Sequence, residues 1–233
     1  MDFARAKVIA CATVIEEMAP LLPAGMQVES LEFGLHLRPE KLHVRLQQAV
    51  DQAAGSADTV LLGYGLCSNA VVGLRSDWCT LVVPKVHDCI ALLLGSREGH
   101  LREARREPGT YYLTKGWIEA GGTPFSEHRS LVERYGEARA RRMSRLALRN
   151  YTRLVFIQTG SRELDEYRRY ARRASEEFGL RYQEIRGEPA LLKKMIYGPW
   201  DDEIIVVRPG RAIGYADFDF GPEQGEVHVE GAG

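Results

Sequence analysis

Three of the four cysteines in this chain of 233 residues stand where a folded sheet would bring distant side chains together. Three short apolar runs, rich in β-branched residues, are typical of strands covered on both faces of a parallel sheet. They are residues 7–12, 59–64 and 80–86. Cys11 lies near the carboxyl end of the first run, and Cys67 and Cys89 follow the second and the third. Because parallel strands end at the same edge of a sheet, we expect these three thiols to converge.

Converging thiols point to metal binding. Thiolates held close together repel one another and need a cation to neutralise them. Three cysteines suit a 4Fe–4S cluster with one iron left open to bind or activate a small substrate. They also suit Zn²⁺ if His87 completes the ligand set. We therefore predict that Cys11, Cys67 and Cys89 are metal ligands, with an iron–sulfur cluster as the first choice and zinc as the alternative.

The surroundings of Cys67 favour the cluster. Gly63 and Gly65 flank a tyrosine just before it, and glycines allow the backbone to approach closely and direct N–H groups at inorganic sulfide. We therefore take both glycines as cofactor-binding residues. Asn69 and His87 are the candidates for a catalytic or substrate-facing role.

Other interpretations of these residues stay open. A cysteine taken alone is more often a small packed side chain than a ligand, and we expect that role for Cys79, which precedes its strand. His87 beside Cys89 also permits a thiol–imidazole nucleophile, although neighbouring residues rarely face each other. The segment is no dinucleotide loop, because Ser68 stands where the third glycine is needed. The other histidines follow no ligand spacing and are expected at the surface.

Helical and strand patterns alternate along the chain, which predicts an α/β fold with a doubly wound, mostly parallel sheet. The remaining predicted strands are residues 26–33, 153–158, 180–185 and 203–207. The predicted helices are residues 14–22, 39–54, 126–150, 163–178 and 190–197. We expect two related βα halves, residues 1–96 and 125–220, with an aromatic and Gly-rich insertion at 97–124 between them. Residues 221–233 are expected to be a loose tail.

Composition excludes several classes of protein. The 31 basic and 32 acidic residues leave a net charge of −1, so no overall field attracts nucleic acid or an anionic membrane. No apolar run is long enough to cross a bilayer, and the N-terminal residues lack the layout of a signal peptide. Four cysteines in such a chain predict a reducing, cytoplasmic location.

Arginines crowd two regions of predicted helix. They are Arg139, Arg141, Arg142, Arg145, Arg149 and Arg153 in the first region, and Arg168, Arg169, Arg172 and Arg173 in the second. Interleaved glutamates favour solvated helix faces over a binding surface. An acidic partner or a phosphate-bearing ligand is the alternative, and nucleic acid is not expected.

Several long segments resemble a known family. LGYGLCSN (62–69), PKVHDCIALLLGS (84–96), PGTYYLTKGWIE (108–119) and YGPWD (197–201) are similar to the domain of unknown function 1638 family of bacteria and archaea, often anaerobes. The resemblance covers nearly the whole chain, and its motifs carry Cys11, Cys67 and Cys89 but not Cys79. It implies an association with corrinoid-dependent methyl transfer and one-carbon metabolism.

Two hypotheses follow from the residues and the resemblance. The first is a cytoplasmic metalloprotein whose cluster acts on a small polar or sulfur-bearing substrate. The second is a metal-free accessory module that docks through its arginine-rich helices to a methyltransferase or a corrinoid protein. Neither hypothesis includes nucleic acid or a membrane as a partner.

Overall fold

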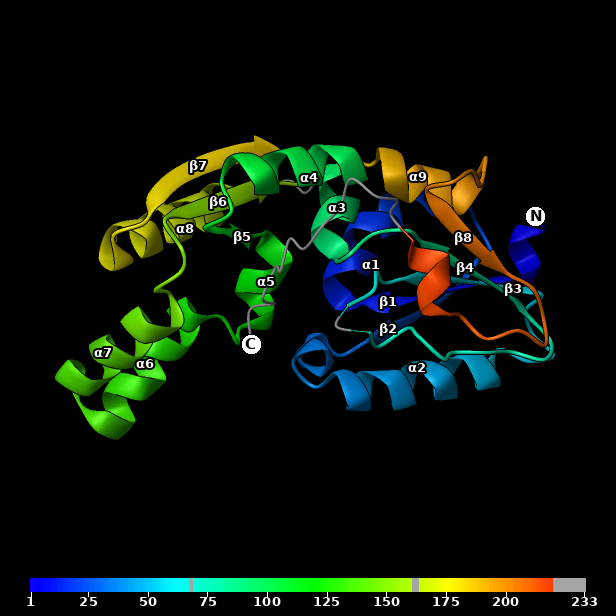
Figure 1. Cartoon of the computed structure of the whole chain (residues 1–233), viewed down its shortest axis with the longest axis horizontal. Coiled ribbons are helices and arrows are strands. Elements are labelled where there is room, and N and C mark those ends of the chain that lie inside the picture. The colour runs from blue at the N-terminus through cyan, green and yellow to red at the C-terminus, as the bar shows by residue number, and fades with distance from the viewer. Residues whose placement is uncertain (68, 161–163, 220–233) are drawn as a thin grey trace. The chain divides into compact units, whose positions relative to one another are not determined.

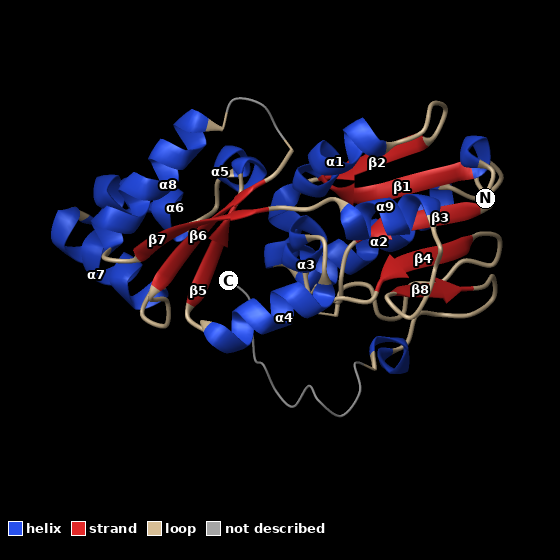
Figure 2. Ribbon diagram, turned by 90° about the horizontal axis from the view of Figure 1, so that it is seen from above, coloured by secondary structure: helices blue, strands red, loops and turns tan. Residues whose placement is uncertain are grey.

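The computed structural model describes residues 1–67, 69–160 and 164–219, which divide into two compact units. The first unit comprises residues 1–100 and the chain from residue 188 onward, and the second comprises residues 101–187. Each unit contains a mostly parallel β-sheet with helices packed against it (Figures 1 and 2). The predicted α/β class is therefore confirmed.

The first unit is built on a five-stranded sheet of order β2-β1-β3-β4-β8. In that order the strands are Gln27–Leu31, Ala6–Cys11, Thr59–Gly63, Thr80–Pro84 and Ile204–Val207. The first four are parallel to one another, and β8 is antiparallel to β4. Nearly every side chain of β1, β3 and β4 is buried, as expected for strands covered on both faces.

Helices cover both faces of this sheet. They are α1 (Ala12–Met18), α2 (Pro39–Gln52), α3 (Cys89–Leu94) and α9 (Ala190–Tyr197). Short 3-10 turns occupy Phe3–Arg5, Ala19–Leu21, Phe33–Leu37 and Tyr215–Phe218. Figure 1 shows α2 along one face and α9 along the other. α2 begins with Pro39, which suits a first helical turn, and its apolar stripe is buried against the sheet.

The winding of this sheet reverses between β1 and β3. From β1 the chain passes to β2 on one side, and it then returns to form β3 on the other side of β1. In open α/β sheets, ligands bind outside the carboxyl ends of the strands at such a reversal. The topology therefore marks the carboxyl ends of β1 and β3 as the place to look for a site.

The second unit has a parallel three-stranded sheet of order β5-β6-β7. The strands are Thr110–Leu113, Arg153–Gln158 and Arg181–Arg186. The helices are α4 (Arg97–Arg106), within which the two units divide, α5 (Lys115–Ala120), α6 (Pro124–Tyr135), α7 (Glu137–Ala147) and α8 (Asp165–Phe178). Leu154 and Phe156 of β6 share a core with Ala171 and Ala174 of α8.

Three expected segments differ in the structure. The helix predicted over 126–150 is two helices, because Gly136, with a φ of +77°, ends α6. The segment 97–124, predicted as an insertion, contains β5, which pairs with β6 as an integral strand. The strand predicted at 203–207 is present as β8, but it pairs with β4 in the first unit, whereas we expected it in the second half. The tail predicted at 221–233 lies outside the described residues.

Arg153, which we grouped with the arginines of a solvated helix face although it also begins the predicted strand 153–158, is fully buried. It is the first residue of β6, so the strand carries it into the second unit rather than along the helix before it. Its guanidinium donates to Thr110 Oγ1 at 2.8 Å, to Gln183 Oε1 at 2.8 Å and to Glu103 Oε2 at 3.2 Å. These bonds offset much of the cost of burying the charge.

The phenol of Tyr111 on β5 predicts how the second unit responds to alkali. Burial, followed by the nearby Tyr151, Tyr170 and Glu127, raises the pKa of Tyr111 above its ordinary value. The stability that this proton supplies is complete below about pH 10, where unfolded tyrosines ionise, and is lost as the pH rises further. We expect Tyr111→Phe to flatten the fall in unfolding free energy between pH 9 and 11 by up to about 1.4 kcal/mol per pH unit. Urea titrations of both proteins at several pH values measure the difference.

An identical pH dependence in the wild type and Tyr111→Phe would contradict the prediction. Tyr135→Phe, at an exposed position, is the control.

Candidate functional site

The three cysteines predicted as ligands lie at one edge of the five-stranded sheet. Cys11 is the last residue of β1, Cys67 follows the end of β3, and Cys89 is the first residue of α3, after β4. β1, β3 and β4 are parallel neighbours, so their carboxyl ends bring the three loops together. We call these cysteines with their loops the cysteine edge. It coincides with the reversal of winding between β1 and β3.

Two glycines allow the loops of the cysteine edge to pack closely. The backbone N–H of Cys67 donates to the carbonyl of His87 at 3.0 Å, which ties the loop after β3 to the loop after β4. A Cβ atom on Gly65 would lie 2.7 Å from the carbonyl oxygen of Val86, and one on Gly63 would lie 2.6 Å from a β1 side chain. Both positions therefore exclude a side chain, in line with the close backbone approach expected of these glycines.

The backbone at Cys67 and Asn69 is left-handed although neither residue is glycine. Their φ angles are +46° and +71°. For a residue with a Cβ this conformation costs about 1–2 kcal/mol. Asparagine tolerates it better than most residues, whereas cysteine has no such preference. Strain of this kind collects at functional sites, which favours a role for the Cys67 thiol beyond packing.

The strain at Cys67 predicts an unusual stability order. In metal-free protein we expect Cys67→Gly to be more stable than Cys67→Ala by about 1 kcal/mol, because glycine removes the left-handed penalty. At Cys89 we expect the reverse order, because that residue begins α3 and glycine is a poor helix former. Urea unfolding of the four variants tests both. The same Gly–Ala order at the two positions would show that Cys67 is not strained.

The thiols of the cysteine edge influence one another electrostatically. Burial, then Asp88 and then Cys11, raises the pKa of Cys67. Burial, then Cys11, Cys67 and Asp88, raises the pKa of Cys89 well above its ordinary value. Burial also raises the pKa of Cys11, which the backbone N–H groups of the following α1 turn partly counteract. Without a cation the three thiols are therefore protonated at neutral pH and are poor nucleophiles.

Tyr64 places a buried hydroxyl beside these thiols. Its pKa is raised by burial and then by Cys11, Cys67 and Cys89, so the phenol lies within the field of all three. The Tyr64 hydroxyl has no hydrogen-bond partner among the described residues, and neither has that of Thr13 in the first turn of α1. Buried polar groups are nearly always paired, so an unpaired one points to a missing ligand, ion or water. Sequence reasoning used the flanking glycines and overlooked Tyr64, although a tyrosine in a buried motif needs a partner for its hydroxyl.

The two candidates for substrate contact differ in exposure. Asn69 is exposed on its left-handed turn, and His87 is half-buried with its carbonyl bound to the Cys67 amide. Asp88 caps α3 by accepting from the N–H of Ile90 at 2.9 Å. His100, expected at the surface, is buried with Nδ1 3.8 Å from Asp88 Oδ1. An Asp before an apolar helical run is a recognisable capping signal, but its pairing with His100 depends on the tertiary structure.

The part of the chain that the structure describes contains no preformed site for a single metal ion. No three His, Cys, Asp or Glu side chains there are arranged to hold a metal ion. Cys11, Cys67 and Cys89 are among the described residues, so they do not form such a group.

Cys79 lies at the opposite, amino edge of the sheet, directly before β4. It is fully buried, and its thiol donates to the carbonyl of Ala57 at 3.1 Å. Its position matches the structural role expected from the sequence, well separated along the strands from Cys11, Cys67 and Cys89.

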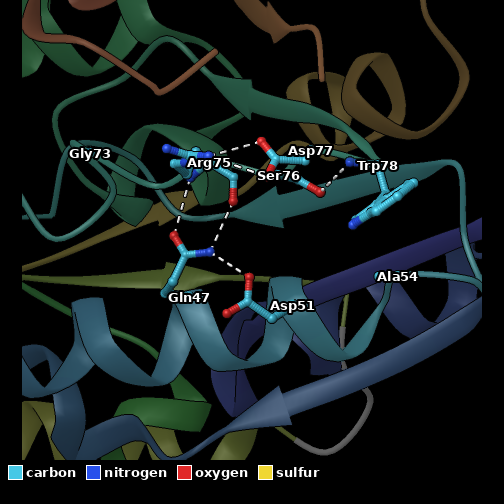
Figure 3. Close-up of a pocket in the computed structure, with 8 residues that line it drawn as sticks. All are labelled: Gln47, Asp51, Ala54, Gly73, Arg75, Ser76, Asp77 and Trp78. Atoms are coloured by element: carbon cyan, nitrogen blue, oxygen red, sulfur yellow. Dashed lines mark hydrogen bonds and ion pairs between the residues drawn. The ribbon is translucent and has the colours of Figure 1, made fainter. Parts of the chain in front are cut away.

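A hollow of about 550 Å³ also lies at this amino edge (Figure 3). Gln47 of α2 bridges Asp51 and the backbone of Arg75, and Arg75 pairs with Asp77. The indole of Trp78 stands exposed at its rim. The polar groups here satisfy one another, and the hollow shares no residue with the cysteine edge.

Comparison with known proteins adds a family and no activity. Residues 30–196 match the family described as "Protein of unknown function (DUF1638)". No curated protein and no solved structure matches the chain. Among the described residues, no helix is both long and apolar enough to cross a membrane.

Proposed function

The chain belongs to the DUF1638 family, and from that premise we propose that its cysteine edge holds an iron–sulfur cluster through Cys11, Cys67 and Cys89. One observation carries the proposal: three cysteines from the ends of β1, β3 and the loop after β4 stand at one edge of an open α/β sheet, beside its winding reversal. The family description names no reaction, and the chemistry of these three side chains supports the proposal.

The donor set fits a thiolate-bound centre. Cys67 and Cys89 are half-buried, and Cys11 is buried. A zinc ion needs every ligating sulfur at about 2.3 Å from one point. In a cluster each cysteine binds a different iron atom, so the three sulfur atoms need not approach a single metal ion. Three cysteines suit a cluster with one open iron, and a zinc site is an alternative outcome of the test.

Two costs in the metal-free protein support a bound group. Cys67 adopts a conformation that glycine would take more easily, and Tyr64 buries a hydroxyl without a partner. Backbone hydrogen bonds to His87 and from Ala70 hold the loop at Cys67, and the left-handed conformation turns that residue toward the neighbouring loops. Sulfide or a substrate atom near the site can accept a hydrogen bond from the Tyr64 hydroxyl.

Each residue of the cysteine edge has a separate role in such a site. A bound cluster with an open iron supplies a place to polarise a small substrate or to pass an electron. The cysteines anchor it, Gly63 and Gly65 let the loops around it pack closely, and the Tyr64 hydroxyl donates one hydrogen bond. Asn69 and His87 lie on the loops that a small polar or sulfur-bearing substrate approaches. A reducing cytoplasm fits this chemistry, because oxygen would oxidise the thiols.

Purification without oxygen tests the proposal. We expect a brown protein that contains iron and acid-labile sulfide and absorbs near about 400 nm, as thiolate-bound clusters do. Stoichiometric zinc without sulfide would replace the cluster with a zinc site. A colourless protein with reduced thiols, which takes up neither metal on reconstitution with iron and sulfide or with zinc, would overturn the proposal. The link to corrinoid proteins and one-carbon metabolism stays a prediction from the family resemblance.

A further inference from the structure

Most of the surface of helix α7 (Glu137–Ala147) is exposed to solvent. It packs beside α6 (Figure 1), where His128 Nδ1 lies 2.8 Å from the hydroxyl of Ser144. Only Ala140 and Ser144 of the helix are buried. Its remaining side chains are exposed, so most of the helix circumference faces solvent.

Arginines that make no ion pair with the described part of the chain dominate that exposed surface. They are Arg139, Arg142 and Arg145 of α7, and Arg149 just after it. None of their guanidinium groups makes an ion pair with a described residue, whereas Arg141 pairs with Glu137 at 2.9 Å. Among the described residues, the interleaved glutamates that the sequence suggested as partners therefore leave three positive charges of α7, and that of Arg149 just after it, without an ion pair.

Two apolar side chains lie among these arginines. Met143 is 44% exposed and Leu146 is 61% exposed. The spacing of Arg139, Arg142, Met143 and Leu146 by three and four residues places them on one face of the helix. We call this set, with Arg145 and Arg149, the arginine face. Arginine and methionine are enriched at protein interfaces, where an apolar centre lies within a polar rim.

The chemistry of the arginine face identifies the class of partner. A helix that lies in a membrane surface needs a continuous apolar face, and here two apolar side chains are surrounded by charge. Binding to a nucleic acid without sequence preference commonly uses aromatic stacking, and α7 contains no aromatic residue. A protein surface with carboxylates around a small apolar patch complements both the charges and the two apolar side chains.

We infer that the arginine face is a docking surface for an acidic segment of another protein, with Leu146 and Met143 as the apolar anchor. The inference is independent of the cluster, because every residue it uses lies in the second unit. Its charges supply fast, salt-sensitive association, and the apolar anchor supplies contact that salt does not screen.

Fluorescence anisotropy of the full chain with labelled peptides tests the inference. The probe is an amphipathic helical peptide of Glu, Leu and Ala, and its counterpart carries Lys in place of Glu. We expect the acidic peptide to bind at low salt and the basic one not to bind. Arg139→Gln with Arg142→Gln should weaken binding about tenfold, and Leu146→Gln should weaken it several-fold even at high salt.

Arg169→Gln with Arg173→Gln is the matched control, because it removes two exposed arginines that make no ion pair with described residues of the same unit. It should change the affinity less than twofold. An equal loss in this control, or no effect of Leu146→Gln, would reduce the effect to general charge attraction and overturn the inference. So would absence of peptide binding, or tighter α7-dependent binding of phosphatidylserine vesicles or single-stranded RNA. Unchanged circular dichroism is expected throughout, because all substituted side chains are exposed.

Discussion

Cys67→Ser is expected to abolish the iron and sulfide content of protein purified without oxygen. A serine hydroxyl is a hard, weakly acidic oxygen and a poor substitute for a soft thiolate. Cys67 also ties the loop after β3 to the loop after β4 through its backbone, and that bond survives the substitution. The loss therefore reports the missing sulfur atom rather than a missing loop. Cys11→Ser and Cys89→Ser should lose most of the cluster for the same reason.

Cys79→Ser supplies the internal control. The Cys79 thiol donates to the Ala57 carbonyl at 3.1 Å, and a serine hydroxyl can make the same hydrogen bond. We expect wild-type iron and sulfide in this variant, because Cys79 lies at the opposite edge of the sheet. Iron, sulfide and zinc per chain, measured for all four variants, decide the question. Equal metal contents in Cys67→Ser and Cys79→Ser would remove the shared site.

Arg153→Met is expected to lower the free energy of unfolding of the second unit by about 3 kcal/mol. Removing the guanidinium leaves the buried Thr110 hydroxyl, Gln183 and Glu103 without their shared donor. Methionine fills a similar volume, so the loss is mainly of polar partners and only slightly of packing. The expected value is at the low end for a broken buried pair, because Glu103 stays partly accessible to water.

Arg181→Met on the neighbouring strand β7 is the matched control. Arg181 pairs with Glu107 at the surface, and more than half of its side chain is exposed. Exposed pairs of this kind contribute little, so we expect no measurable change in stability. Urea unfolding of the two variants gives the comparison. An Arg153→Met protein as stable as Arg181→Met would show that the buried network carries no net stabilisation.

The local sequence pattern was sufficient to predict the strands β1, β3 and β4 and the sheet edge at their carboxyl ends. The apolar runs at β1, β3 and β4 are short and rich in β-branched residues, which in a chain with alternating helical segments favours strands covered on both faces. Once those strands are parallel, Cys11, Cys67 and Cys89 must lie at their carboxyl ends and Cys79 at the other end. That inference needs no contact information, and the structure places all four residues accordingly.

Pairings between distant segments were not contained in the local pattern. β5 is a strand of only four residues in an aromatic segment, and nothing near it reveals that β6 lies alongside. The sequence of β8 has an ordinary strand pattern, but that pattern does not show that the strand lies antiparallel beside β4. Arg153 begins a strand that the sequence predicts, but the partners that allow its burial, Thr110, Gln183 and Glu103, come from distant segments.

The sequence by itself therefore determined the α/β class, the cysteine edge and the separate role of Cys79, because these follow from strand order and side-chain type. Tertiary structure alone decided the unpaired Tyr64 hydroxyl, the burial of His100 and Arg153, and the four charges of the arginine face that make no ion pair with described residues. Each of these depends on whether a partner from a distant part of the chain lies within hydrogen-bond or ion-pair reach. Such proximity arises only from folding, since residues far apart in sequence carry no local record of their neighbours.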